Sequence, residues 1–426
     1  MEHSTFIDVH CHVLTLSHPN FLSFVDTLRV RKSEIIYSQI RSPDYLTRAL
    51  FRNRGESLRN LLTVMANSPG LIFGIMEDDL KGQFAKEGDP PPLVQEGALR
   101  ISGRCFGSIA LCPLIMDFDD RGRSSSDAYY YRPPVASIDA QIRDVLIGIR
   151  DYRLSRPNGM LQIHPFLGVN TRNHTLDSLC LFLGHHMGAW LPGRGRARTV
   201  FRAMQKYSSN ENSVAETPGG ECLFSGIKLY PPLGFDPWPE PGEEREKVEL
   251  LFGFCEKRGI PITTHCDDQG FRVVPKEEAF AFTAPSRYRA VLERFPELRI
   301  DFAHFGRQYT TNLMRPAPTE WFDEIIRLID AYPNVYTDLS FNGVEPAYYE
   351  RLVAALAALP EATREKVESR VMFGSDFVVN LMKVRSYADY FRIFGSSPLE
   401  AELQARFCSE NPARFLFEGL GPGTST

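Results

Sequence analysis

The stretch FPELRIDFAH, residues 295–304, has a counterpart in YPNVYTDLS, residues 332–340. In both, an aromatic residue and a proline follow a helical pattern, and a short β-type run then ends on a polar residue. Because proline does not continue a helix, each stretch reads as the return from a helix into a strand. Strands joined in succession through helices lie parallel, so the repeated joint predicts a parallel α/β sheet.

Five strand ends follow one another at nearly constant spacing. Their polar markers lie 36 to 39 residues apart, which is the length of a strand, a helix and two loops. The expected strands are 225–230, 260–265, 298–304, 335–340 and 371–376. The segments between them carry apolar residues at i, i+3, i+4 and i+7, which predicts amphipathic helices, as at Val248, Leu251, Phe252 and Cys255.

Three further strand candidates occupy the N-terminal half, at 7–12, 106–114 and 161–169. Together with the five later ones they give the eight strands of a (β/α)8 TIM barrel. The segments after the first and third strands are long, so we expect large helical or loop insertions at about residues 17–100 and 170–222. No separable linker is evident, and the sequence predicts a single barrel domain over residues 1–426.

Composition indicates an ordinary soluble enzyme-sized protein. The net charge of −5 is mild and no basic stripe suggests nucleic-acid binding. The N-terminus lacks the features of a signal peptide, and no window is apolar enough for a membrane span. The eight cysteines are scattered singly, as thiols in a reducing compartment would be. We therefore expect a cytoplasmic protein that acts on a small molecule, and barrel analogy allows a homodimer.

The first expected strand carries the motif FIDVHCH, residues 6–12. Strand side chains alternate, so Asp8, His10 and His12 are expected on one face and Cys11 on the other. Two imidazoles on one face can converge on a metal ion, whereas the plainer alternative is a pair of core or surface histidines.

The later strands end on further candidate ligands: His265 in ITTH, His304 in DFAH and Asp376 in FGSD. All strand C-termini of such a barrel lie on one face, where barrel active sites are built. The sequence therefore predicts that these side chains surround one site together with the first-strand histidines. Cys266 is expected to face away.

Lys228 in GIKLY is expected to point into the barrel, on the same face as Tyr230. A buried lysine needs a partner or a function. It pairs with an inward acid such as Asp8 or Asp338, binds substrate, or is carboxylated by CO2 and bridges two metals. Four other polar residues are interpreted as structural or loop residues: Asp117, His164, His185 and His186.

Read jointly, FIDVHCH, GIKLYP, ITTHCDD, AHFG, FGSDF and NPARFLF resemble the amidohydrolase superfamily, specifically its amidohydrolase-related branch. The resemblance implies a TIM barrel with a divalent metal, usually zinc, held by four matching positions: His10, His12, His265 and Asp376. His304 matches a second-metal ligand or a catalytic group, and Lys228 matches the lysine that is carboxylated in binuclear members. Val378 departs from the pattern, because a proline usually follows GSDF.

The implied activity is hydrolysis of an amide, lactone or ester bond by a metal-activated water. Asp376 would act as general base and His304 would stabilise oxyanion charge on the attacked carbonyl. Arg307 and Tyr230 are the expected substrate-binding residues, although Arg307 reads equally well as a solvated loop arginine. The same branch includes metal-dependent, non-oxidative decarboxylases with nearly the same ligands, and this remains the alternative.

Overall fold

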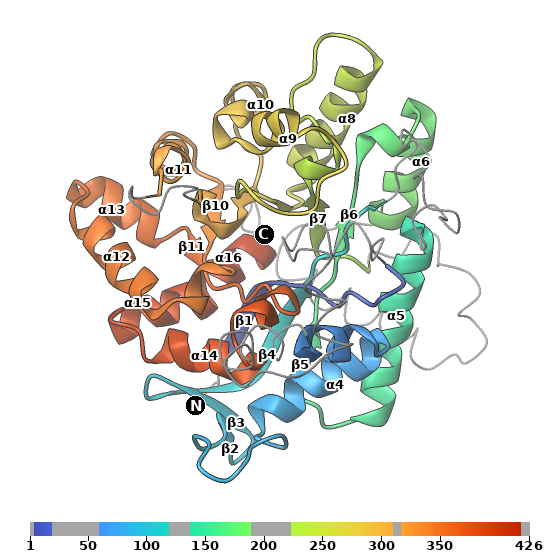
Figure 1. Cartoon of the computed structure of the whole chain (residues 1–426). Helices are drawn as coiled ribbons and strands as arrows, with labels where there is room; N and C mark the ends of the chain where they lie inside the picture. The colour runs from blue at the N-terminus through green and yellow to red at the C-terminus, as the bar shows by residue number, and fades with distance from the viewer. Residues whose placement is uncertain (1–3, 19–58, 119–136, 189–222, 310–316, 419–426) are drawn as a thin grey trace, which may run out of the picture.

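A computed structural model describes residues 4–18, 59–118, 137–188, 223–309 and 317–418. Parts of both expected insertions, residues 19–58 and 189–222, lie outside the described residues. The strands form a central ring and the helices lie around it, as Figure 1 shows. The TIM-barrel class predicted from the repeated helix-to-strand joints is thereby confirmed, while the single-domain organisation stays a prediction.

In the described part of the chain, parallel strands form two hydrogen-bonded sheets. The first contains β1 (Ser4–Cys11), β4 (Arg104–Pro113) and β5 (Leu161–Ile163), with the antiparallel hairpin β2 (Val94–Gln95) and β3 (Ala98–Ile101) added to β4. The second runs β6 (Phe166–Gly168), β7 (Gly226–Leu229), β8 (Ile262–Thr264), β9 (Ile300–Phe302), β10 (Val335–Asp338) and β11 (Val371–Met372). The expected third strand is therefore divided into β5 and β6.

Backbone contacts join the two sheets at both seams. Leu114 bridges Phe166 where β4 meets β6, and Cys11 bridges Phe377 where β1 meets the end of β11. At the second seam the Val9 N–H also donates to the carbonyl of Phe373 at 3.1 Å. These contacts close the ring, so the strand C-termini share one face.

Helices cover the outside of the barrel. In chain order they are α4 (Pro69–Leu80), α5 (Ile138–Ser155), α6 (Leu176–Met187), α8 (Glu243–Arg258), α9 (Lys276–Thr283), α10 (Arg289–Arg294), α11 (Glu320–Ala331), α12 (Pro346–Ala357), α13 (Glu361–Glu368), α14 (Tyr387–Gly395), α15 (Ala401–Ala405) and α16 (Asn411–Phe417). The apolar positions predicted for α8 are all buried, and its C-terminal cap is Gly259 with φ 63°. A left-handed cap of this kind suits glycine, which has no Cβ to clash.

The buried apolar side chains of the described residues form two clusters. Phe6 packs among the rings of Phe373, Phe391 and Phe394, between the strands and α14. A second cluster contains Ile7, Val9, Tyr336 and Met372 with two side chains of α16, Phe415 and Leu416. Successive residues of β1 thus serve the two faces of the sheet, as strand geometry requires.

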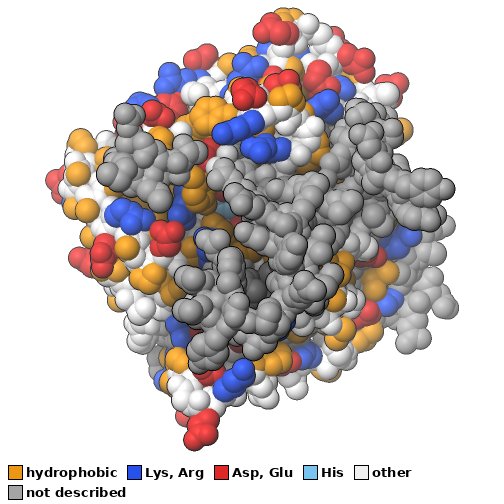
Figure 2. Space-filling model, viewed as in Figure 1, with side chains coloured by type: hydrophobic (Ala, Val, Ile, Leu, Met, Phe, Trp, Pro, Cys, Tyr) orange, Lys and Arg blue, Asp and Glu red, His pale blue; other side chains and the backbone are white. Residues whose placement is uncertain are grey.

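Short η segments and a π turn connect the strands and helices: η1 (Thr171–Asn173), η3 (Pro231–Leu233), η4 (Pro285–Tyr288), η5 (Ala303–Gly306), η6 (Asn342–Val344), η7 (Val379–Met382) and the π-helical η8 (Arg406–Glu410). Basic and acidic side chains are interspersed over the described part of the face in Figure 2. Among the described residues, no helix is both long and apolar enough to cross a membrane.

Candidate metal centre

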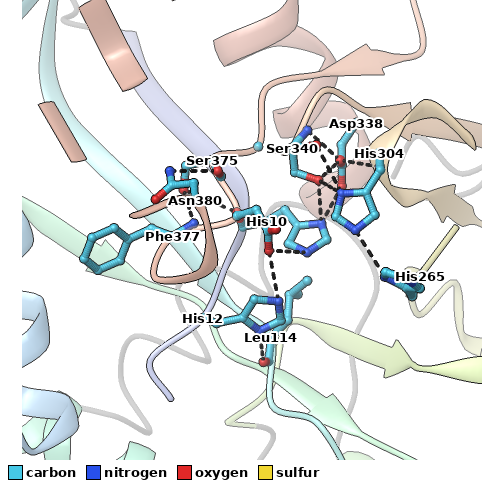
Figure 3. A network of polar contacts seen from close by, with 12 residues as sticks. His10, His12, Leu114, His265, His304, Asp338, Ser340, Ser375, Phe377 and Asn380 are labelled. Atoms are coloured by element: carbon cyan, nitrogen blue, oxygen red, sulfur yellow. Dashed lines mark hydrogen bonds and ion pairs between the residues drawn. The ribbon is translucent and has the colours of Figure 1, made fainter. Parts of the chain in front are cut away.

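The predicted ligands lie where the strands end. His10 is on β1 with His12 just beyond it, His265 follows β8, His304 follows β9, and Asp376 lies in the loop after β11. His304 and Asp376 have φ values of 61° and 57°. This left-handed backbone is uncommon outside glycine and is found at sites where the surrounding structure holds it in place. Figure 3 shows the histidines converging at this end of the barrel.

One ligand group consists of His10, His12 and Asp376. The Asp376 Oδ1 atom lies 3.6 Å from Nε2 of His10 and 3.4 Å from Nε2 of His12. In a tetrahedral site with metal–ligand bonds of about 2.0–2.1 Å, neighbouring ligand atoms lie about 3.3–3.4 Å apart. All three residues are buried, and the Nε2 atom of His10 has no hydrogen-bond partner among the described residues. The donors therefore fit a divalent metal.

A second group consists of His265, His304 and Asp267. Nε2 of His304 lies 3.2 Å from Nδ1 of His265, and Asp267 Oδ1 lies 3.3 Å from Nε2 of His265. A third group, His10, His304 and Asp338, shares one histidine with each of the other two, and the His10 and His304 rings are 4.9 Å apart between centroids. The three groups are therefore contiguous, and the binding of one ion by His10, His12, His265 and Asp376 stays a prediction.

In each of the four histidines, one ring nitrogen points to a hydrogen-bond acceptor. Nδ1 of His12 lies 2.9 Å from the Leu114 carbonyl, and Nδ1 of His10 lies 2.8 Å from Asp338 Oδ2. Nδ1 of His304 lies 3.1 Å from the Ser340 carbonyl. In His265 it is Nε2 that lies 3.3 Å from both the Gln269 carbonyl and Asp267. Carbonyls and carboxylates only accept, so in His10, His12 and His304 the Nδ1 atom carries the proton. The Nε2 atom of these three rings keeps its lone pair, as a metal ligand requires, and Nδ1 of His265 faces that of His304 at 3.2 Å.

Electrostatics keep the imidazoles of His10 and His304 neutral and the carboxylates of Asp338 and Asp376 charged. Burial lowers the pKa of His10 to about 3, despite the opposing charge of Asp338. Burial likewise lowers the pKa of His304. Burial opposes the ionisation of Asp338 and Asp376, but contacts with the histidines outweigh it and hold both carboxyl pKa values below the usual range. Neutral imidazole and ionised carboxylate are the states in which these groups bind metals.

Asp8 takes a different position from the one that strict alternation predicts. The pairing register of β1 and β4 is irregular between Asp8 and Cys11. Asp8 accepts hydrogen bonds from the Tyr387 hydroxyl of α14 at 2.9 Å and from the Ser375 N–H at 2.8 Å. It therefore anchors the loop that carries Asp376 and does not join the histidines. Burial raises the pKa of Asp8 to about 7.

The Asp376 loop is fixed by its backbone and by a lack of space. The Asp376 N–H donates to the carbonyl of His10 at 2.7 Å. A Cβ at Gly374 would lie 2.8 Å from Cβ of His10 and 3.0 Å from Cβ of Ser340, so only glycine fits there without a shift. Val378, where the family pattern has proline, is buried.

Lys228 points into the barrel, as the strand pattern predicts, while its neighbours Ile227 and Leu229 belong to the larger hydrophobic cluster. Its side chain is buried, and Nζ forms no hydrogen bond to any described residue. Of the three alternatives for Lys228, the pairing with Asp8 or Asp338 is therefore not formed. Burial lowers the pKa of Lys228 to about 8, although acids including Asp338 act in the opposite direction.

The expected substrate-binding residues have different surroundings. The Tyr230 ring lies 4.5 Å from the His265 ring, and its hydroxyl accepts the Phe271 N–H at 3.1 Å. Arg307 donates to Asn342 at 3.2 Å and to Glu345 at 3.0 Å. Tyr230 thus borders the ligand groups, whereas Arg307 already has protein partners.

Residues set aside in the sequence are not members of the ligand groups. Cys266 contacts the Thr283 carbonyl, Asp117 accepts the Asn170 N–H, His164 packs against Phe417, and His186 packs against Phe182 and Phe224. His185 is exposed on α6.

The sequence reading gave Asp267, Asp338 and Ser340 no part in the ligand groups. Asp267 lies two residues beyond a candidate ligand in THCDD, and Asp338 and Ser340 lie two apart at the end of β10. The strand pattern placed Asp338 and Ser340 on one face near the end of a strand. Their partners depend on ring orientation, which the pattern does not encode.

The family model described as amidohydrolase matches residues 212–417, from before β7 to the end of α16. This match confirms the resemblance to the amidohydrolase superfamily that the motifs predicted. A search of curated proteins found no match.

Solved structures with a similar course of the chain have low sequence identity. An uncharacterised TIM-barrel protein from Bordetella bronchiseptica is 15% identical with a TM-score of 0.43, over 97% of this chain and 98% of that one. A probable 2-pyrone-4,6-dicarboxylic acid hydrolase from Acinetobacter baumannii is 12% identical with a TM-score of 0.45, over 97% and 99%. A 5-carboxyvanillate decarboxylase from Novosphingobium aromaticivorans, complexed with manganese, is 12% identical with a TM-score of 0.45, over 97% and 96%.

Proposed function

We propose that the protein is a metal-dependent hydrolase that cleaves an amide, lactone or ester bond of a small molecule. The observation that carries the proposal is the group of His10, His12 and Asp376, whose ligand atoms have the spacing of a tetrahedral metal site. Zinc is the proposed ion because imidazole and carboxylate suit it. A divalent ion held there supplies Lewis acidity and brings the pKa of a coordinated water towards neutrality.

Asp376 is the proposed general base. Its carboxylate is ionised and lies against both first-strand histidines, so it can accept the proton of an attacking water. The same group would return that proton to the leaving atom. The left-handed backbone and the hydrogen bond to the His10 carbonyl hold the carboxylate in place for both transfers.

His304 supports a ligand role better than the oxyanion role. Its Nδ1–H is directed to the Ser340 carbonyl, so the Nε2 atom facing His265 has a lone pair and no proton. An oxyanion needs a donor, and burial lowers the pKa of His304 and so disfavours a second proton. We therefore assign His304 and His265 to a second ion or to the metal-facing wall of the site.

A carboxylated Lys228 would bridge a second ion to the first. A carbamate forms from the neutral amine, which a pKa of about 8 makes accessible near neutral pH. Carboxylation would provide an oxygen ligand at the buried, unpartnered Nζ. We propose this bridged state for the hydrolase, with Tyr230 as a substrate contact beside His265.

A non-oxidative decarboxylase is the second candidate, favoured by the same free Nζ of Lys228. A free ammonium group inside the barrel would bind a substrate carboxylate. Arg307 would add a rim contact, provided that a substrate anion displaces its bond to Glu345.

The two activities differ in their products. The protein should be incubated in 18O-labelled water with panels of amides, lactones, esters and aromatic carboxylic acids. The hydrolase proposal predicts one 18O atom in a carboxylate product, and the exposed-histidine variant His185→Gln should retain this activity. Release of CO2 without 18O incorporation would refute hydrolysis and support the decarboxylase.

A further inference from the structure

The hydroxyl of Ser340, just after β10, lies between histidines of the two ligand groups. Its Oγ atom is 2.8 Å from Nδ1 of His304 and 3.1 Å from Nδ1 of His10. It also donates to Oδ1 of Asp338. The side chain is fully buried, and Figure 3 shows these residues around it. One hydroxyl therefore contacts both His10 on β1 and His304, which follows β9.

The hydrogen-bonding capacities of these groups leave one consistent assignment of protons. A serine hydroxyl has one donor and two acceptor lone pairs. The Ser340 hydroxyl donates its single proton to Oδ1 of Asp338. Both lone pairs of Oγ then face ring nitrogens, and each nitrogen must carry a proton to avoid two acceptors meeting. His10 shares its proton with Asp338 Oδ2, at 2.8 Å.

We propose that Ser340 is a positioning residue that holds His10 and His304 in the same tautomer, with the proton on Nδ1. Both Nε2 lone pairs then face the metal centre. A single hydroxyl would thus link the ligand geometry of the two groups. The inference rests on the proposed function only in treating the two rings as metal ligands.

The contribution of the Ser340 hydroxyl to the orientation of each ring depends on the other hydrogen bonds that the ring makes. His304 Nδ1 also lies 3.1 Å from the Ser340 carbonyl, and His10 retains Asp338 when the hydroxyl is removed. Truncation should therefore affect His304 more than His10. Residues that orient metal-binding histidines typically change metal affinity about 10–100-fold, and the remaining contacts place Ser340→Ala near about 10-fold.

The test uses histidine ring 15N NMR on the metal-free full chain, with the two signals identified from His10→Gln and His304→Gln. The wild type should show both rings protonated at Nδ1. Ser340→Ala should add the Nε2–H form of His304 and weaken zinc binding about 10-fold. The control is Ser225→Ala, because Ser225 is also buried but its hydroxyl has no hydrogen-bond partner among the described residues.

Two outcomes would overturn the proposal. One is a wild-type spectrum in which either ring is protonated at Nε2, which needs no variant to fold. The other is a Ser340→Ala protein whose His304 tautomer and zinc affinity match those of Ser225→Ala. A wild type that shows both Nδ1–H tautomers but binds no zinc would contradict the proposed function and leave the positioning role of Ser340 supported.

Discussion

Replacing Asp338 by asparagine should disrupt the metal centre through a single ring. The Oδ1 atom of Asp338 accepts the N–H groups of His304 at 3.0 Å and Ser340 at 2.9 Å, as well as the Ser340 hydroxyl. Oδ2 accepts from Nδ1 of His10 at 2.8 Å. Asparagine will place its oxygen where Oδ1 accepts these three hydrogen bonds, so its NH2 group will take the place of Oδ2 and face His10.

The loss of zinc affinity follows from the ring proton of His10, which must move from one ring nitrogen to the other. Nδ1 of His10 becomes an acceptor for the new NH2 group, and the ring proton shifts to Nε2, where it blocks the metal-facing lone pair. The tautomer that binds zinc carries its proton on Nδ1, so binding zinc leaves the buried NH2 group of the asparagine without an acceptor. An unsatisfied buried donor costs about 1–3 kcal/mol, and every 1.4 kcal/mol is about tenfold in affinity. Asp338→Asn should therefore weaken zinc binding about 10–100-fold.

The assay is a zinc titration in competition with a chromogenic chelator. The matched control is Asp330→Asn, since Asp330 is half exposed on α11 and pairs with Lys366. The control should bind zinc as the wild type does. An Asp338→Asn protein with wild-type zinc affinity would refute the assignment of the His10 tautomer.

Three further results are expected. Glu77 is buried and accepts hydrogen bonds from Lys81, the Tyr152 hydroxyl and the Met160 N–H. Glu77→Ala should therefore lower the free energy of unfolding in urea by roughly 2–4 kcal/mol. A loss below about 1 kcal/mol would contradict this network. In the metal-free protein, Lys228→Met should raise unfolding stability by up to about 3 kcal/mol at pH 7, because burial lowers the pKa of Lys228 from 10.5 to about 8. That cost of the buried ammonium is fully present below pH 8 and disappears as the pH rises towards 10.5, so an equal gain at pH 7 and pH 10 would be inconsistent with a buried free amine. Chelator treatment should lower the thermal midpoint, and zinc at 100 times its Kd should restore about 2.7 kcal/mol, whereas an unchanged midpoint would argue against a native-state metal.

The barrel fold, and the face of the barrel on which the site lies, could be predicted from the sequence. The recurring joint before His304 and Ser340 fixes strand direction and spacing, and parallel strands bring their C-termini together. Parity also placed Lys228 inside the barrel. These inferences need only backbone periodicity, which tertiary packing rarely reverses in buried strands.

The grouping of the ligands was beyond the sequence. Whether His265 adjoins Asp376 or His304 depends on how strands on different sides of the ring extend over its centre, and on which nitrogen each ring presents. Asp8 was misplaced because a register irregularity between Asp8 and Cys11 interrupts the alternation of β1. Such irregularities leave no clear mark on a seven-residue motif.

The most direct test of a metal centre at His10, His12 and Asp376 is the metal content of the purified chain after reconstitution with zinc and removal of the excess. The wild type and His185→Gln should retain at least about one equivalent, and His12→Gln should lose the ion of the first group. A folded wild type without metal, or a His12→Gln protein that retains zinc as tightly as the wild type, would contradict a metal centre at these three residues.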